Sequence, residues 1–104
     1  MDQGDPESFF TVTAEADGDH LRVVVAGEVD MATADSMSRA TVRDDIRRVT
    51  LDLRAVTFVD SAAIHAVVRL AERLPGNLTV LPSHQVRRVL DISGLGDQPW
   101  LATG

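Results

Sequence analysis

The sequence predicts a single α/β domain, and three observations support that prediction. The chain has 104 residues, which is enough for one hydrophobic core and too few for two. Two runs rich in β-forming residues, 9–16 and 20–26, flank the tripeptide Asp-Gly-Asp at 17–19, which is a strong hairpin signal. Residues 49–74 then join an alternating apolar run to an amphipathic helix.

The composition excludes several classes of protein. The 16 acidic and 10 basic residues give a formal charge of −6, which disfavours binding to nucleic acid or to an anionic membrane. The absence of cysteine excludes disulfides, thiol catalysis and cysteine-ligated zinc. No apolar stretch is long enough to span a bilayer, and the N-terminus lacks a signal-peptide pattern, so we expect a cytoplasmic protein. Residues 1–8 are polar and acidic, which predicts a disordered tail ahead of a domain at 9–104.

The two hairpin strands should pair antiparallel, and the second is expected to be central. Val23, Val24 and Val25 are consecutive, which is typical of a strand covered on both faces or nearly so. We therefore expect further strands or helices to surround it.

A first helix is expected after this strand. Asp30 or Thr33 can cap a helix that continues to about Arg43. The pattern is weak, and the expected packing residues are Ala34, Met37 and Val42.

The segment from 49 to 74 contains the clearest pattern in the chain. Apolar and polar residues alternate from Val49, which predicts a buried strand. After Asp60 and Ser61, both good helix caps, a helical stripe should pack on that strand. The stripe consists of Ile64, Val67, Val68, Ala71 and Leu74. The residues expected to face water are His65, Arg69, Glu72 and Arg73.

The C-terminal third predicts one more strand and one more helix. Pro-Gly-Asn at 75–77 forms a turn, and residues 78–81 make a short strand that completes a βαβ crossover. Ser83 should cap a helix that buries Val86, Val89 and Leu90. Gly94 then lies where a left-handed residue ends a helix, and residues 99–102 could add an edge strand.

Ser61 is the residue with the most chemical options. A nucleophilic serine would need the G-x-S-x-G turn, which is absent around Ser61. One interpretation is that Ser61 is a plain helix cap, whose hydroxyl accepts a hydrogen bond from a first-turn N–H group. The other is a phosphorylation site, because a phosphate at a helix N-terminus meets free N–H donors and the positive end of the helix dipole.

Other polar residues are interpreted more plainly. The histidines show no metal-ligand spacing, and the glycines form no phosphate-binding fingerprint. Glu28 and Asp30 could be a solvated loop pair or part of a binding surface. Arg87 and Arg88 are expected to form a solvated helix face.

Three separated segments together resemble the STAS domain, and within it the bacterial anti-sigma factor antagonists, or anti-anti-sigma factors. The segments are Gly27-Glu28-Val29-Asp30 after a valine-rich strand, Leu51-Asp52-Leu53 leading to Phe58-Val59-Asp60-Ser61, and Leu90-Asp91-Ile92-Ser93-Gly94-Leu95. They occur in the same order and with compatible spacing over about residues 9–102.

The resemblance implies a mixed sheet of four to five strands with helices packed on one side, and a protein-binding switch that is not an enzyme. In this family the unmodified domain binds an anti-sigma factor that is also a serine kinase, and this frees a sigma factor for transcription. The kinase phosphorylates the serine directly after the motif aspartate, here Ser61, and a PP2C-type phosphatase resets it. ATP belongs to the kinase, so no cofactor or metal is expected in this chain.

The partner surface should centre on the start of the second helix and on the loop before the first. The residues expected there are Glu28, Asp30, Thr33, Asp60, Ser61, Ala62 and His65. The family usually carries a second small hydroxyl residue and then glycine after the phosphorylated serine, where this chain has Ala62 and Ala63. The alternative function is a STAS subunit of a lipid-transport or stress-signalling assembly, in which Ser61 only caps a helix.

Overall fold

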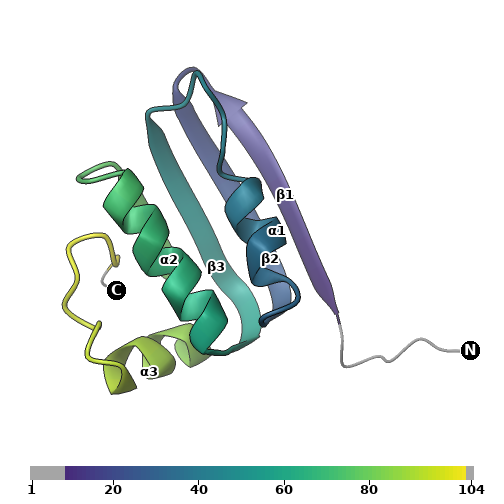
Figure 1. Ribbon diagram of the computed structural model, residues 1–104, viewed down its shortest axis with the longest axis vertical. Helices are drawn as coiled ribbons and strands as arrows, with labels where there is room; N and C mark the ends of the chain where they lie inside the picture. The colour runs from purple at the N-terminus through teal and green to yellow at the C-terminus, as the bar shows by residue number, and fades with distance from the viewer. Residues whose placement is uncertain (1–8, 103–104) are drawn as a thin grey trace, which may run out of the picture.

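The computed structural model describes residues 9–102 and contains one mixed sheet with three helices on one of its faces (Figure 1). The elements are, in chain order, β1 (Phe10–Asp17), β2 (His20–Val29), α1 (Ala34–Arg39), β3 (Arg48–Val59), α2 (Ser61–Arg73), β4 (Leu78–Pro82) and α3 (His84–Ile92). The strand order is β1-β2-β3-β4, so the predicted mixed sheet is confirmed with four strands. The predicted disordered tail, residues 1–8, lies outside the described residues.

β1 and β2 form the predicted antiparallel hairpin, with Asp17 opposite His20 at the turn. Gly18 has a φ of 62° in that turn, a conformation that costs glycine little. At the other end, Gly27 has a φ of 97°, and a Cβ there would collide with the carbonyl oxygen of Phe9. That oxygen instead accepts a hydrogen bond of 2.8 Å from the N–H of Glu28. Glycine at 27 therefore keeps the two strands together up to the edge of the sheet.

β2 lies inside the sheet, but the helices cover only one of its faces. Val23 and Val25 are fully buried, whereas Val24 between them is 37% exposed. The prediction of a strand covered on both faces or nearly so is therefore wrong, although β2 is a central strand as expected. β-branched side chains also suit the exposed face of a strand, so consecutive valines do not by themselves indicate burial on both sides.

α1 is shorter than predicted. It ends at Arg39, and Val42, an expected packing residue, is 60% exposed, although Ala34 and Met37 are buried as expected. The Thr41 side chain explains the early end, because its hydroxyl donates to the carbonyl of Ser38 at 2.6 Å. A threonine bound back to the preceding turn in this way competes with continuation of the helix.

β3 runs parallel to both of its neighbours, and α2 carries the chain from β3 to β4 as the predicted crossover. The side of α2 that faces the sheet is rotated from the predicted stripe. Ile64 and Val67 are buried as expected, but Val68, Ala71 and Leu74 are only half-buried. The buried residues of α2 are Ala63, Ile64, Ala66, Val67 and Leu70. Two alanines on the buried side allow α2 to lie close to the sheet and to α1.

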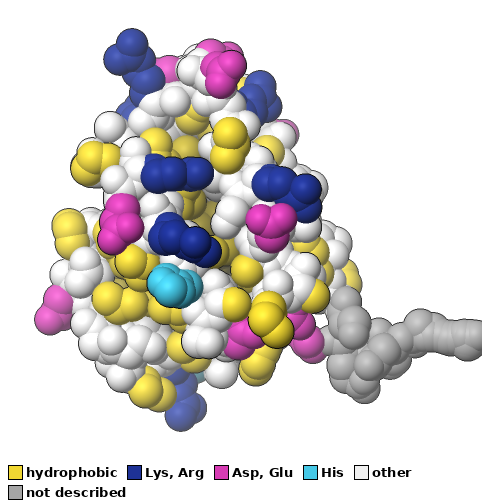
Figure 2. Space-filling view, viewed as in Figure 1, with side chains coloured by type: hydrophobic (Ala, Val, Ile, Leu, Met, Phe, Trp, Pro, Cys, Tyr) yellow, Lys and Arg dark blue, Asp and Glu magenta, His cyan; other side chains and the backbone are white. Residues whose placement is uncertain are grey.

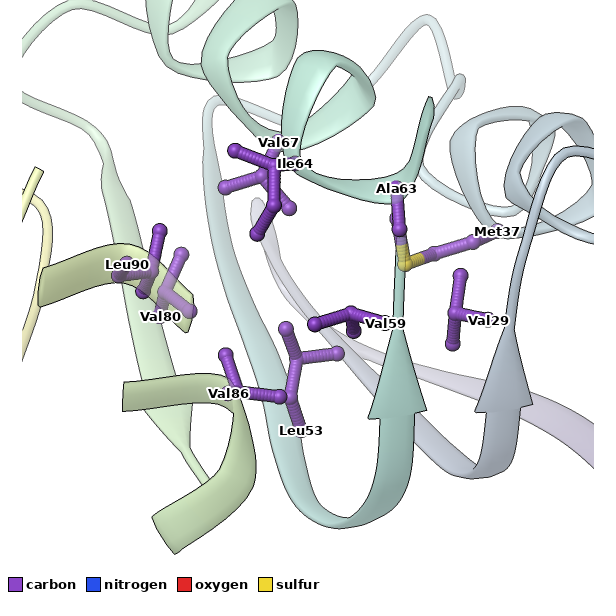
Figure 3. Close-up of a pocket in the computed structure, with 10 residues that line it drawn as sticks. All are labelled: Val29, Met37, Leu53, Val59, Ala63, Ile64, Val67, Val80, Val86 and Leu90. Carbon is purple, nitrogen blue, oxygen red and sulfur yellow. The ribbon is translucent and has the colours of Figure 1, made fainter. Parts of the chain in front are cut away.

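The core is closely packed where α2, α3 and the sheet meet. Figure 3 shows ten apolar side chains that surround a void of about 10 Å³ beneath the first turn of α2. They are Val29, Met37, Leu53, Val59, Ala63, Ile64, Val67, Val80, Val86 and Leu90. A void of this size and apolar lining holds no ordered water, so these residues support the start of α2 directly.

α3 begins and ends as predicted, and its arginines differ from the prediction. The Ser83 hydroxyl accepts the N–H of Val86 at 3.1 Å, and Gly94 has a φ of 78° with the N–H of Leu95 bound to Leu90 at 2.8 Å. Arg87 is half-buried and donates to the carbonyl of Ala102 at 2.7 Å, so the solvated face that was expected for both arginines holds only for Arg88. This hydrogen bond helps to hold the chain after α3 against the sheet.

The last residues join the sheet less extensively than predicted. The expected edge strand at 99–102 is a single bridge between Leu101 and Val80. Its two hydrogen bonds join Val80 to Trp100 at 2.8 Å and to Ala102 at 2.9 Å. Proline at 99 lacks an N–H, which limits the length of any ladder there.

The face of the sheet opposite the helices carries one buried carboxylate. Asp52 is 6% exposed and accepts from the Arg54 Nε at 3.0 Å, the Arg54 Nη2 at 2.8 Å and the Arg22 Nη2 at 2.9 Å. These hydrogen bonds, chiefly that from the Arg54 side chain, outweigh the effect of burial and lower the pKa of Asp52 to about 2. The carboxylate joins β2 to β3 across the uncovered face.

Val67→Asp should unfold the domain or come close to it. Val67 is 3% exposed, and a carboxylate there has no partner, so we expect a loss of more than about 3 kcal/mol in the free energy of unfolding. Urea denaturation followed by circular dichroism measures it. His65→Asp, on the exposed side of α2, is the control and should change stability little. Equal midpoints for both variants would contradict the packing of α2.

Asp52 should make stability depend on pH at the acid end. Its pKa is lowered from 3.8 when unfolded to about 2 when folded, so its contribution is complete above 3.8 and is lost as pH falls toward 2. Asp52→Asn should lower the melting temperature at neutral pH and flatten the decline between pH 4 and about 2. Melting curves measured at a series of pH values check this. Parallel curves for the two proteins would rule it out.

Candidate functional site

The predicted site residues lie at the edge of the sheet where β2 and β3 both end. Val29 is opposite Val59 in the parallel ladder, so the segments that follow these residues leave the sheet side by side. Figure 1 shows the start of α2 and the start of α1 at this same end of the molecule. The N–H of Asp60 donates to the carbonyl of Val29 at 3.2 Å, which extends the pairing of the two strands into the loops.

Asp60 is the helix cap and also ties the two loops together. Its backbone is extended, with φ of −112° and ψ of −174°, and its Oδ1 accepts the N–H of Ala63 at 3.0 Å. Its Oδ2 accepts the N–H of Met31 at 3.0 Å. One carboxylate therefore caps α2 and fixes the loop that leads to α1.

Ser61 is the first residue of α2 and is exposed. The interpretation of Ser61 as the cap is therefore wrong, because the residue before it takes that role. Within residues 9–102, the Ser61 hydroxyl has no hydrogen-bond partner, and no bond joins it to His65 one turn later. Among the described residues, the hydroxyl is therefore exposed and unbonded.

The loop before α1 is held by its own side chains. The Asp30 Oδ1 accepts the N–H groups of Ala32 at 2.9 Å and Thr33 at 3.2 Å. The Thr33 hydroxyl accepts the N–H of Asp30 at 2.9 Å and lies 3.2 Å from the carbonyl of Glu28. Asp30 and Thr33 thus form a closed turn, and Thr33 precedes α1 without a side-chain capping bond.

The structure brings most of the predicted residues together but separates one. Asp30, Thr33, Asp60, Ala62 and His65 lie with Ser61 on the helix side of this edge. Glu28 alternates with the buried residues of β2, so its side chain belongs to the opposite face of the sheet. Glu28 is therefore the predicted site residue that the fold places apart from the others.

A shallow groove beside Ser61 was not predicted. It has a volume of about 350 Å³ and runs between α2 and α3. Its lining residues are Val59, Asp60, Ser61, Ile64, His65, Val68, Val89 and Ser93. Val68 and Val89 were expected in the core but are half-buried because they face this groove. The groove exists because of the relative position of α2 and α3. No local sequence pattern predicts that position.

Two large apolar side chains project near this edge. Met31 and Ile92 are each 80% exposed. The signal for both was present in the sequence, since Met31 stands inside a polar turn and Ile92 falls outside the apolar stripe of α3. Exposed apolar side chains beside a groove are typical of a protein-binding surface.

Comparisons with known proteins identify the family of this chain. A family model for the STAS domain matches residues 11–103. The chain belongs to the STAS domain family. This STAS domain is similar to the crystal structure of an anti-sigma factor antagonist from Mycobacterium paratuberculosis, with 27% identity and a TM-score of 0.80 over 96% of this chain and 90% of that one.

Two further structures share the fold. SpoIIAA, an anti-sigma factor antagonist in its unphosphorylated form, has 22% identity and a TM-score of 0.69 over 90% of this chain and 88% of its own. The Bacillus cell fate determinant SpoIIAA in the phosphorylated form has 22% identity and a TM-score of 0.66 over 90% and 91%. The predicted family and fold class are thereby confirmed.

Among residues 9–102, no three or more histidine, aspartate or glutamate side chains gather as metal ligands. No helix in the same range has the length and apolar character needed to cross a membrane.

Asp60→Ala should destabilise the domain, and Ser61→Ala should not. Loss of the cap and of the bond to Met31 should cost about 1–2 kcal/mol, whereas the Ser61 hydroxyl makes no bond that its removal would break. Asp60→Asn keeps one acceptor oxygen and should fall between the two. Thermal denaturation of the three variants measures this order. A larger loss for Ser61→Ala than for Asp60→Ala would mean that the serine is the cap after all.

Proposed function

We propose that this STAS domain is an anti-sigma factor antagonist controlled by phosphorylation of Ser61. In its unmodified form it binds an anti-sigma factor that is also a serine kinase, and so frees a sigma factor for transcription. A PP2C-type phosphatase removes the phosphate. The observation that carries the proposal is an exposed, unbonded serine at the first position of α2, directly after the capping aspartate of the family motif.

The surface at the end of β2 and β3 suits a protein partner. The turn at Asp30–Thr33 is held by its own hydrogen bonds, Met31 projects from it, and the groove beside Ser61 offers apolar walls. An apolar centre with polar residues around it is the usual composition of an interface. The similarity to a mycobacterial anti-sigma factor antagonist supports an anti-sigma factor as that partner.

A phosphate on Ser61 would be tolerated by the fold. In the described chain, the N–H groups of Ser61 and Ala62 have no acceptor, and both stand at the positive end of the α2 dipole. The structures of SpoIIAA in unphosphorylated and phosphorylated forms, both similar to this domain, support a switch without refolding. The added charge beside Asp60 would disfavour a closely packed partner.

The replacement of the usual glycine by Ala63 does not alter the surface that a kinase would meet. Ala63 is 2% exposed, and its methyl group points into the core, as Figure 3 shows. Ala62 is half-buried and lies beside Ser61. Ala62 is therefore the only one of these two departures from the family pattern that a kinase could contact.

Phosphorylation of Ser61 should weaken binding without unfolding the domain. A pull-down from the native cell followed by mass spectrometry identifies the partner, which is then purified and incubated with the domain and ATP. We expect one phosphate, on Ser61, with affinity reduced more than about tenfold and an unchanged circular dichroism spectrum. Ser61→Ala should bind and stay unmodified, and Ser61→Asp should weaken binding only partly.

The matched control is Ser36→Ala, a half-buried serine on α1, which should be phosphorylated and released like the parent. A phosphate on another residue with Ser61 unmodified would contradict the proposal. Equal affinity for the fully phosphorylated protein would also contradict it.

A further inference from the structure

A line of basic side chains continues from Ser61 along the exposed face of α2. His65, Arg69 and Arg73 follow Ser61 at intervals of four residues, and all three are exposed. Each interval advances about 6 Å along the helix, so the line is roughly 18 Å long. Figure 2 shows basic side chains and a histidine over the middle of this face. We call the three residues the α2 ridge.

The charges around the ridge leave it basic within an acidic protein. A groove of about 400 Å³ between α1 and α2 is lined by Asp35, Ser38, Ala66, Arg69, Leu70, Glu72 and Arg73. Among the acidic residues that line this groove, Asp35 forms an ion pair with Arg39 at 3.2 Å. Glu72 is the other one, and it has no ion pair in the described range. The positive charges of Arg69 and Arg73 therefore exceed the single unpaired negative charge in the groove. The whole chain carries −6, so this basic face is a local exception.

We propose that the α2 ridge binds an acidic segment of the same anti-sigma factor, an inference that rests on the proposed function. Arg69 and Arg73 each present a planar fork of N–H donors that matches carboxylates. They lie about 6 Å apart along the helix, so carboxylates spaced by one helical turn would meet both. The ridge is continuous with Ser61, so one partner covers both.

The two arginines of the ridge act separately from the phosphate. Arg69 and Arg73 are roughly 12 and 18 Å from Ser61 along the helix, beyond the screening length of about 8 Å at physiological salt. A phosphate on Ser61 therefore leaves their attraction for an acidic partner largely intact. The two arginines raise the association rate in both states, whereas the phosphate acts at the docked edge and raises the dissociation rate.

The test measures association and dissociation rates with the purified partner at 25–400 mM NaCl, for the parent and for Arg69→Glu/Arg73→Glu. We expect the association rate of the double variant to fall about tenfold or more at low salt and its salt dependence to flatten. The association rate of the double variant should fall by the same factor, relative to the parent, when Ser61 is phosphorylated in both proteins. Arg43→Glu/Arg88→Glu, which reverses two exposed arginines outside α2, is the control and should stay within about twofold of the parent by the small effect of remote charges.

Because Arg73 also donates to the Thr41 hydroxyl at 3.4 Å, Arg69→Glu alone is measured as well, and circular dichroism checks that every variant is folded. Unchanged association rates and unchanged salt dependence in the folded variants would overturn the proposal that the α2 ridge binds the partner. Release of the partner on Ser61 phosphorylation would still support the proposed function. Equal losses in the ridge and control variants also overturn it, because they would reflect net charge alone. Failure of the parent to bind any anti-sigma factor overturns both proposals.

Discussion

The carboxylate of Asp60 is the contact on which the functional edge depends. Its two oxygens accept N–H groups from segments that are 32 residues apart, Met31 before α1 and Ala63 in the first turn of α2. Without it, the α2 terminus would lose its cap and the loop from β2 would lose its anchor to β3. The parallel pairing of β2 with β3 brings these segments within reach, and Asp60 fixes them there.

This use of Asp60 explains why Ser61 is available. At most helix starts the side chain of a serine or aspartate is needed to satisfy a first-turn N–H group. Here the aspartate satisfies Ala63, and the serine stands one position further on with its hydroxyl exposed. A modification at Ser61 therefore adds charge at the surface without removing a bond that the fold needs. The tight packing under this turn, with a void of only about 10 Å³, holds the backbone of the first turn of α2 in place.

The two faces of the sheet have different roles. The helices cover one face and supply the apolar core, while the other face is held by the ion pairs of Asp52 with Arg22 and Arg54. The site residues belong to the helix face, and Glu28 is the predicted one that belongs to the other. The exposed side of α2 lies between two grooves, one toward α1 and one toward α3. Residues of α2 therefore line both grooves next to the site.

The sequence by itself determined the domain class, the hairpin at Gly18, the strand-to-helix unit centred on Asp60 and Ser61, and the ends of α3. These features depend on neighbouring residues, whose alternation, glycine conformations and caps act over a few positions. It did not determine that Val24 would be exposed, that α1 would stop at Arg39, or that Arg87 would hold the C-terminal segment. Tertiary structure also decided which of two adjacent capping residues would bind the helix, and it formed the groove between α2 and α3. Each of these outcomes depends on residues distant in sequence, which come together only once the sheet register and the helix positions are set.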